Sequence, residues 1–263
     1  MKLVATDLDG TVVRPDGTIS ARTLAAFAAC EVAGIDVVYV TGRPPRWLKD
    51  VVEQTGHSGT AICGNGAIVY DLGAERVISS RTMSGAVALD VAARVSVACP
   101  GTAFAVETLG GFGREHAYVA RYDAASGRAP MPLAELVADG DVVKLLCRNE
   151  SSSGDEMLDA VRAALKGIAS PTHSNPHDCL VEVSRLGVSK AVALAELAGA
   201  RGIARADVVA FGDMPNDIEM LRWAGYGYAM TGGHAEAIAA ADATAPRCLD
   251  DGVAQVIERL LAS

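Results

Sequence analysis

Two aspartates, Asp7 and Asp9, stand one residue apart at the end of the apolar run "LVAT", and "GT" follows them at once. Two carboxylates this close repel each other, so stability alone does not explain the pair. A carboxylate can attack phosphorus and form an aspartyl-phosphate, which divides one difficult displacement into two easier ones. A second carboxylate two residues further on can protonate the leaving alcohol and then deprotonate a water molecule. The pair therefore suits covalent phosphoryl transfer, although an isolated D-x-D-G serves at least as often as a turn or a helix cap.

Other polar residues stand where predicted strands end or a predicted helix begins. Thr41-Gly42-Arg43 follows one strand, "GDMPND" (212–217) follows another, and Lys190 opens a helix in "GVSKAVAL". Ligands of an open parallel sheet bind beyond the carboxyl ends of its strands. Carboxylates, a hydroxyl and an ammonium gathered at that edge suit a phosphoryl group and a magnesium ion, which prefers hard oxygen ligands.

The elements that must position these residues alternate at both ends of the chain. Residues 20–34 have apolar side chains at helical spacing, with Ser20 as the N-cap and Gly34 as the stop. The segments "IDVVYVTG" (35–42) and "ADVVAFGD" (206–213) have the near-continuous apolar character of buried strands. Such strands alternating with helices predict a parallel sheet covered by helices on both faces.

The middle of the chain has a different pattern, in which adjacent strands have short links. "TAFAVETL" (102–109) and "HAYVARY" (116–122) are predicted strands, and the glycine-rich "GGFGRE" between them is a hairpin signal. In "CLVEVS", Glu182 alternates with two valines and is expected on the solvated face of a strand. This pattern predicts an antiparallel sheet with two helices on it.

These two patterns predict two domains, one inserted into the other. The core is an α/β domain with a Rossmann-like, doubly wound parallel sheet, formed by residues 1–82 and 187–263. The inserted domain is α+β and covers residues 83–186. The chain, at 263 residues, is long enough for this arrangement.

Composition excludes several other classes of protein. Half of the residues are apolar and the net charge is -9, which argues against broad binding to nucleic acid phosphates. The six cysteines are scattered without a C-x-x-C pair, which argues against a zinc site and favours a reducing compartment. The sequence has no apolar stretch of the roughly 18 residues that a membrane span needs. We expect a cytoplasmic protein with no nucleic acid or membrane partner.

Four motifs in order resemble those of the haloacid dehalogenase superfamily, on its phosphatase branch. They are "DLDGT" after the first strand, "VTGR" after the second, the isolated Lys190, and "GDMPND". The large insertion resembles the type IIB cap of the Cof-like sugar phosphatases, and "CGNGAIVYD" (63–71) and "GVSKAVAL" are further Cof-like marks. The resemblance covers nearly the whole chain. It implies a cap domain over a catalytic core, and Mg²⁺ as the cofactor.

The resemblance also implies roles for the carboxylates. Asp7 corresponds to the nucleophile and a magnesium ligand. Asp9 corresponds to the general acid and base, with its backbone carbonyl as a second ligand, and Asp213 to the third protein ligand of the metal. Asp217 matches a position just outside the direct ligands, around the metal or the lysine.

The remaining motif residues correspond to phosphate contacts. The resemblance assigns this role to Thr41, Gly42, Lys190 and Asn216, although Asn216 is equally suited to cap the helix that it begins. Arg43 lies next to these, and its sequence position leaves two roles open: it steers the substrate phosphate, or it pairs with a carboxylate of the core. Asn65 in "CGNGA" either contacts substrate or fixes its loop.

The implied function is Mg²⁺-dependent hydrolysis of a small phosphorylated metabolite, a sugar phosphate first of all, through an aspartyl-phosphate. A phosphomannomutase-like phosphosugar mutase is the alternative within enzymes, and a non-catalytic phosphometabolite sensor is the alternative outside them. A dehalogenase fits less well, because those enzymes lack the second acid that Asp9 supplies. We expect a monomer or a small homo-oligomer, and the sequence does not name the physiological substrate.

Overall fold

The chain folds into two units, seen in a computed structural model that describes residues 1–121, 128–176 and 178–262. The core unit comprises Met1–Ser79 and Ser189–Ser263, and the inserted unit comprises Ser80–Val188. The insertion predicted from the sequence, 83–186, lies within the inserted unit. Both segments of the core unit contribute strands to one sheet.

The core unit is built on a sheet with the strand order β13-β12-β11-β1-β2-β3-β4-β5. Neighbouring strands from β13 to β3 run parallel, and β4 is antiparallel to β3. The strands are β1 (Leu3–Thr6), β2 (Asp36–Val40), β3 (Thr60–Cys63), β4 (Ile68–Asp71), β5 (Arg76–Ser80), β11 (Val208–Gly212), β12 (Tyr226–Met230) and β13 (Ala243–Ala245). β1 is central, so its carboxyl end lies between those of β2 and β11.

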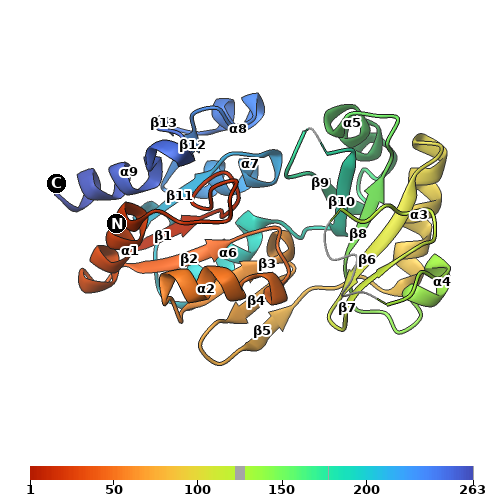
Figure 1. Cartoon of the computed structure of the whole chain (residues 1–263), viewed down its shortest axis with the longest axis horizontal. Coiled ribbons are helices and arrows are strands. Elements are labelled where there is room, and N and C mark those ends of the chain that lie inside the picture. Colours follow the sequence, from red (N-terminus) through yellow and green to blue (C-terminus); the bar gives the residue numbers. More distant parts are fainter. Residues whose placement is uncertain (122–127, 177, 263) are drawn as a thin grey trace. The chain divides into compact units, whose positions relative to one another are not determined.

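Helices lie on both faces of this sheet (Figure 1). On β2, Val38 and Val40 face the core cluster that includes residues of α6 and α7, whereas the ring of Tyr39 packs against Phe27 of α1, 6.0 Å between centroids. Side chains alternate along a strand, so α1 covers the face opposite to α6 and α7. The helices are α1 (Ala21–Val32), α2 (Lys49–Thr55), α6 (Lys190–Ala200), α7 (Ile218–Trp223), α8 (Ala235–Ala240) and α9 (Gly252–Leu261).

The first of these helices begins and ends where the sequence predicts. The Ser20 hydroxyl accepts a hydrogen bond from the Thr23 amide, as an N-cap does. The chain leaves the helix at Gly34, whose φ of 72° is in the left-handed region that glycine adopts without strain. The doubly wound parallel sheet is likewise confirmed.

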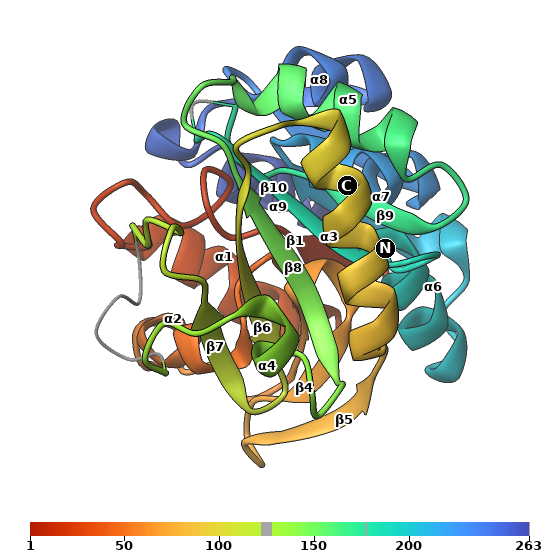
Figure 2. The ribbon, with the colours of Figure 1, turned by 90° about the vertical axis from the view of Figure 1, so that its right-hand side faces the viewer.

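The inserted unit is an antiparallel sheet with two longer helices on one face (Figure 2). The strand order is β7-β6-β8-β10-β9. Apolar side chains of α3 and α5 form a core with one face of the strands. The elements are α3 (Gly85–Ala98), β6 (Ala103–Thr108), β7 (Gly111–Arg114), α4 (Leu133–Leu136), β8 (Val142–Arg148), α5 (Gly154–Ala164), β9 (Ala169–Thr172) and β10 (Leu180–Arg185).

The predicted hairpin of this unit is present, but its second strand comes earlier in the chain than predicted. The glycine-rich segment is itself strand β7, and 116–121 is not a strand; Tyr122, the last residue of the prediction, lies outside the described residues. The turn is Leu109–Gly110, because Thr108 pairs with Gly111, whose φ is 121°. A two-residue turn leaves no room for the longer loop that the glycines suggested.

Glu182 was expected on a solvated face and is instead buried. Its carboxylate accepts a hydrogen bond from Lys144, and both residues are about 5% exposed. Lys144 lies directly across the sheet from the buried Glu107. Alternation along β10 was read correctly, but this face of the sheet carries paired charges rather than water-exposed ones.

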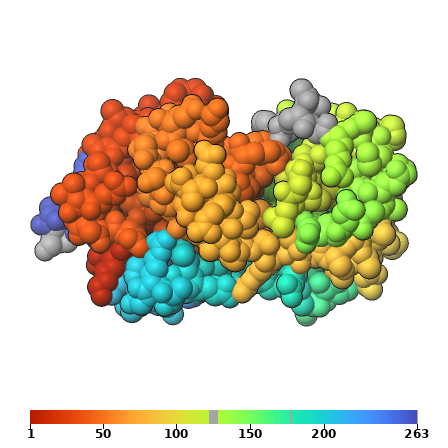
Figure 3. Space-filling model, turned by 90° about the horizontal axis from the view of Figure 1, so that it is seen from below, coloured from red at the N-terminus to blue at the C-terminus, as the bar shows by residue number. Residues whose placement is uncertain are grey.

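Strand β5 forms the edge of the core sheet, and all five of its residues are exposed. Figure 3 shows this edge from below, with the segment around β4 and β5 in orange at the surface. Within the described part of the chain, none of the helices has both the length and the apolar character needed to span a membrane.

Candidate active site

The site is built around the tight turn that follows β1. The Leu8 carbonyl accepts hydrogen bonds from the amides of Thr11, Val12 and Val13, which turns the chain sharply after Asp7. Gly10 has a φ of 79°, and a Cβ atom at this position would collide with the Asp213 carboxylate. Only glycine therefore allows this turn and the β11 carboxylate to lie against each other.

A buried lysine joins the carboxylates of two different segments. Lys190 Nζ donates to Asp7 Oδ1 at 2.5 Å and to Asp217 Oδ1 at 2.7 Å. The Lys190 and Asp217 side chains are fully buried, and that of Asp7 is nearly so. Such a group is stable inside a protein only as part of an ion pair with hydrogen bonds. The structure thus places Lys190 beside Asp7, although 183 residues separate them.

Asp217 uses its second oxygen to fix the loop that follows β11. Oδ2 accepts hydrogen bonds from the amides of Asp213 and Met214, each at 3.0 Å. Both oxygens of Asp217 therefore have donors within the protein. This carboxylate orients Lys190 and the Asp213 loop.

Asp213 completes the cluster and is held by Thr11. The buried Thr11 hydroxyl donates to Asp213 Oδ1 at 3.0 Å. Thr11 belongs to "DLDGT", yet no role for it is predicted from the sequence. The contact depends on the β1 turn meeting the β11 loop, which only the sheet order reveals.

Burial and mutual repulsion change the protonation of this cluster. Burial raises the pKa of Asp7 to about 7. The positive charge of Lys190 opposes this rise, and the negative charges of Asp217 and Asp9 add to it. Burial, with the charges of Asp7 and Asp217, raises the pKa of Asp213 to about 8. Burial disfavours the Lys190 ammonium, but the Asp217 and Asp7 carboxylates outweigh it and raise its pKa, so the amine stays charged.

The cluster has the composition of a divalent metal site. Carboxylate oxygens of Asp7, Asp213 and Asp217 all lie within 4.8 Å of one another. With all three carboxylates ionised, the cluster and its one ammonium carry two negative charges, which a divalent cation would balance. Because Asp217 is engaged by Lys190 and two amides, Asp7 and Asp213 are the carboxylates best suited to bind it. Oxygen donors of this kind suit hard divalent cations such as Mg²⁺ and Ca²⁺.

Asp9 is oriented by Arg43 rather than by this cluster. Arg43 Nη2 donates to Asp9 Oδ1 at 2.5 Å and Arg43 Nε donates to Asp9 Oδ2 at 2.8 Å, which is a bidentate ion pair. The Asp9 side chain is 59% exposed and that of Arg43 20%. Of the two roles that the sequence left open for Arg43, the structure shows pairing with a core carboxylate.

The predicted phosphate-binding residues lie at the ends of β2 and β11. Thr41 follows β2 and is buried, and its hydroxyl accepts a hydrogen bond from the Arg43 amide at 3.1 Å. Gly42 between them is partly exposed. Asn216 Nδ2 donates to the Oδ1 atom of Asn65 at 3.0 Å, and both residues are buried. Asn216 therefore contacts another loop of the core unit.

Comparison with known proteins shows which family this chain resembles. A family model described as haloacid dehalogenase-like hydrolase matches residues 4–257. The chain is 28% identical to the 5-amino-6-(5-phospho-D-ribitylamino)uracil phosphatase YitU of Bacillus subtilis, with 97% of this chain and 96% of that protein covered. It is also 28% identical to a phosphoglycolate phosphatase of Natronomonas pharaonis, with the same coverage.

A solved structure shows the same fold over the whole length. The haloacid dehalogenase subclass IIB sugar phosphatase BT4131 superposes with a TM-score of 0.83 at 21% identity, and the match covers 99% of each chain. Because the family model spans almost the entire sequence, this chain belongs to the haloacid dehalogenase-like hydrolases.

Proposed function

We propose that this protein is a Mg²⁺-dependent phosphatase of small phosphorylated metabolites that uses Asp7 as its nucleophile. The observation that supports this most strongly is the buried ion pair of Lys190 with Asp7 and Asp217, beside Asp213. A charged lysine offsets part of the repulsion between a carboxylate and an incoming phosphate, which would otherwise keep the two anions apart.

The first chemical step transfers the phosphoryl group to the enzyme. An Asp7 carboxylate oxygen forms a bond to phosphorus as the bond to the substrate oxygen breaks, and Asp9 gives its proton to the leaving alcohol. The products of this step are the alcohol and an aspartyl-phosphate on Asp7. Lys190 stabilises the carboxylate before attack and the phosphoryl charge after it.

The second step regenerates the enzyme. Asp9, now ionised, removes a proton from a water molecule, whose oxygen bonds to phosphorus while the bond to Asp7 breaks. Inorganic phosphate leaves, Asp7 is again a carboxylate, and Asp9 again carries its proton. Thr41, Gly42 and Asn216 are the proposed contacts for the phosphoryl oxygens in both steps.

Asp7, Asp213 and the Asp9 carbonyl are the groups proposed to hold Mg²⁺. When bound, the ion would neutralise negative charge on the carboxylate and the phosphoryl group. The excess negative charge of the buried cluster supports this assignment, because ionising both Asp7 and Asp213 is unfavourable without a further cation.

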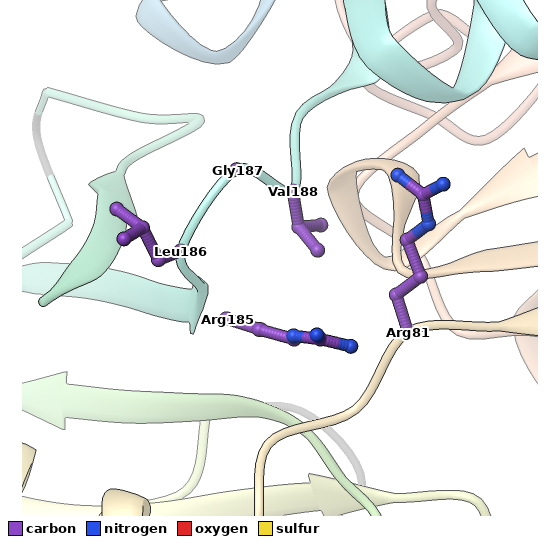
Figure 4. Close-up of a pocket in the computed structure, with 5 residues that line it drawn as sticks. All are labelled: Arg81, Arg185, Leu186, Gly187 and Val188. Carbon is purple, nitrogen blue, oxygen red and sulfur yellow. The ribbon is translucent and has the colours of Figure 1, made fainter.

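We further propose that the inserted unit acts as a cap that sets specificity. The chain enters it at Ser80–Arg81 and leaves it at Arg185–Val188. Figure 4 shows that Arg81 and the 185–188 segment line one pocket, so the entering and leaving segments of the chain are adjacent. Two adjacent connections suit a hinge for opening and closing. Sugar phosphates are the proposed substrates, and the phosphatase names of two relatives support a phosphorylated metabolite.

A phosphate-release screen tests this proposal. The purified protein would be incubated with Mg²⁺ and a panel of sugar, polyol, nucleotide and cofactor phosphates, together with a generic aryl phosphate. We expect phosphate release that EDTA stops and added Mg²⁺ restores, with the highest kcat/KM among sugar or polyol phosphates. Isomerised hexose phosphate in place of free phosphate would indicate a mutase. Tight binding without any turnover would indicate a sensor.

A further inference from the structure

The loop between β3 and β4 holds Asn65 in an unusual backbone conformation. Asn65 has a φ of 57° and a ψ of 29°, which is left-handed, and it is only 3% exposed. Side chains other than glycine rarely adopt this conformation, and asparagine tolerates it best. A buried asparagine with this backbone, between two glycines, holds its side-chain amide inside the core unit and is not a surface turn residue.

The backbone of this loop is fixed to two other segments of the proposed phosphate site. The Asn65 amide donates to the Thr41 carbonyl at 3.0 Å, and the Gly64 amide donates to the Arg43 carbonyl at 3.0 Å. On the other side, a Cβ atom at Gly66 would collide with the carbonyl of Ser189, the residue that caps the helix of Lys190. The loop thus lies between the Thr41–Arg43 segment and the beginning of α6.

The Asn65 side chain reaches the remaining segment. Its Oδ1 atom accepts a hydrogen bond from Asn216 Nδ2 at 3.0 Å. The Nδ2 group of an asparagine carries two hydrogens, so this bond leaves one N–H of Asn216 for another acceptor. Asn216 Oδ1 is buried without a hydrogen-bond partner among the described residues. Buried polar atoms are usually paired, but a phosphoryl oxygen is itself an acceptor and cannot pair with Oδ1, so the second N–H of Nδ2 is the part of this amide suited to a phosphate.

We propose that Asn65 is a positioning residue, which fixes the side-chain amide of Asn216 so that its second N–H points to a phosphoryl oxygen. This inference rests on the proposed phosphatase function and adds to it a residue that lies outside the four motifs. Asn65 does not itself touch the phosphate in this account. It acts through Asn216.

A double-mutant cycle separates this role from a purely structural one. Asn65→Gly removes the amide and keeps the left-handed backbone, and Asn216→Ala removes the group that Asn65 orients. We expect each single variant to raise both the KM for an aryl phosphate and the inhibition constant of inorganic phosphate by about tenfold, as for a lost hydrogen bond to a charged group. The double variant should be no worse than Asn216→Ala alone, because the two residues act as one unit.

Asn65→Asp is the matched control, since aspartate also tolerates the left-handed conformation and keeps an acceptor for Asn216 Nδ2. In the Asn65→Asp protein, adding Asn216→Ala should still weaken binding of inorganic phosphate about tenfold. In the Asn65→Gly protein, adding Asn216→Ala should weaken the binding of inorganic phosphate little further. The Asn65→Asp protein also tests the proposal if Asn65→Gly does not fold. If adding Asn216→Ala to Asn65→Asp leaves the binding of inorganic phosphate unchanged, the proposal is contradicted.

Independent effects of Asn65→Gly and Asn216→Ala that multiply in the double variant would overturn the inference. So would an Asn65→Gly protein with unchanged KM and unchanged phosphate inhibition. Wild-type protein that releases no phosphate from any substrate would instead contradict the proposed function, so the two failures are distinguishable.

Discussion

At the scale of single residues, Asp7 and Asp9 are chemically identical and lie in opposite environments. Asp7 is buried against Lys190, whereas Asp9 is largely exposed and paired with Arg43. A nucleophile needs an ionised carboxylate held in place, and a general acid must exchange a proton with substrate and water. The guanidinium occupies both oxygens of Asp9, so in the proposed mechanism this ion pair must open before Asp9 donates a proton.

Arg43 is therefore expected to leave Asp9 when a substrate phosphate attracts it. We predict that Arg43→Ala raises the KM for an aryl phosphate about tenfold, with a smaller change in kcat, because a charge-assisted hydrogen bond to the phosphate is lost. Arg43→Lys keeps the positive charge without the bidentate geometry, so its KM should lie between those of the wild type and Arg43→Ala. Steady-state kinetics of the three proteins measure this, and an unchanged KM in Arg43→Ala would rule out contact with substrate.

The acidic cluster predicts how stability depends on pH. In metal-free protein, the raised pKa values of Asp7 and Asp213 mean that the folded state keeps protons that the unfolded chain releases near pH 4. Their contribution to the free energy of unfolding is therefore fully present below about pH 4 and is lost as the pH rises through about 7 to 8. Added Mg²⁺ should raise the Tm more at pH 8 than at pH 5.5, because its ligands must be ionised.

Thermal unfolding from pH 5 to pH 8, with and without Mg²⁺, checks this prediction. Asp213→Asn is the control, since it removes one titrating group and one proposed metal ligand together. Its metal-free Tm should depend less on pH than that of the wild type, and Mg²⁺ should stabilise it less. The account of the cluster fails if wild type and variant show the same pH dependence and the same response to Mg²⁺.

At the scale of elements, the segment after β1 contains two glycines with the same backbone requirement. Gly10 and Gly17 both have left-handed φ angles, 79° and 82°. A Cβ atom at Gly10 would collide with the Asp213 carboxylate, whereas nothing lies within 4 Å of one at Gly17. The two glycines therefore share the backbone requirement and differ in their surroundings.

This difference gives a matched pair of substitutions. Gly17→Ala should cost about 1 kcal/mol of unfolding free energy, which is the strain of a left-handed alanine. Gly10→Ala should cost more than this and also weaken Mg²⁺ binding, because Asp213 must move. Urea unfolding measures the first quantity, and the Tm shift on titration with Mg²⁺ measures the second. If both variants lose the same unfolding free energy and bind Mg²⁺ equally well, the contact between Gly10 and Asp213 is unimportant.

Elements also show where sequence patterns are insufficient. The period of two along β10 correctly predicts that Glu182 alternates with valines, but burial depends on Lys144 from a strand that is distant in sequence. The β6–β7 turn was misplaced because glycines suit both a loop and a close-packed strand such as β7, where a Cβ at Gly113 would meet Leu136. Pairing between strands decides both cases, and a single sequence does not encode it locally.

At the scale of the whole molecule, the order of the strands is what assembles the site. β1 lies between β2 and β11, so motifs some two hundred residues apart meet at adjacent strand ends. That Asp7, Lys190 and Asp213 lie close together could be predicted from the sequence, because their motifs in order form a specific pattern; their roles stay proposals. The sequence could not predict the contacts of Thr11 or Asn65, because those residues resemble ordinary turn residues until the strand order brings Asp213 and Asn216 beside them.

The proposed cap makes a prediction about the molecule as a whole. If the inserted unit closes on its two connections when ligand binds, Mg²⁺ together with vanadate, an analogue of transferred phosphate, should reduce the radius of gyration in solution. Small-angle X-ray scattering with and without these ligands measures the change, and Asp7→Asn with the same additions is the control. An identical radius of gyration in all conditions would argue against a closing cap.

Turnover by Asp7→Asn is the most direct test of the central claim that Asp7 is the nucleophile of a phosphatase. Asparagine has nearly the same shape and cannot form the aspartyl-phosphate. We predict that the wild type with Mg²⁺ releases phosphate from an aryl phosphate, and that Asp7→Asn, shown to be folded by its thermal transition, loses nearly all turnover. Phosphate release by Asp7→Asn at the wild-type rate would contradict the mechanism.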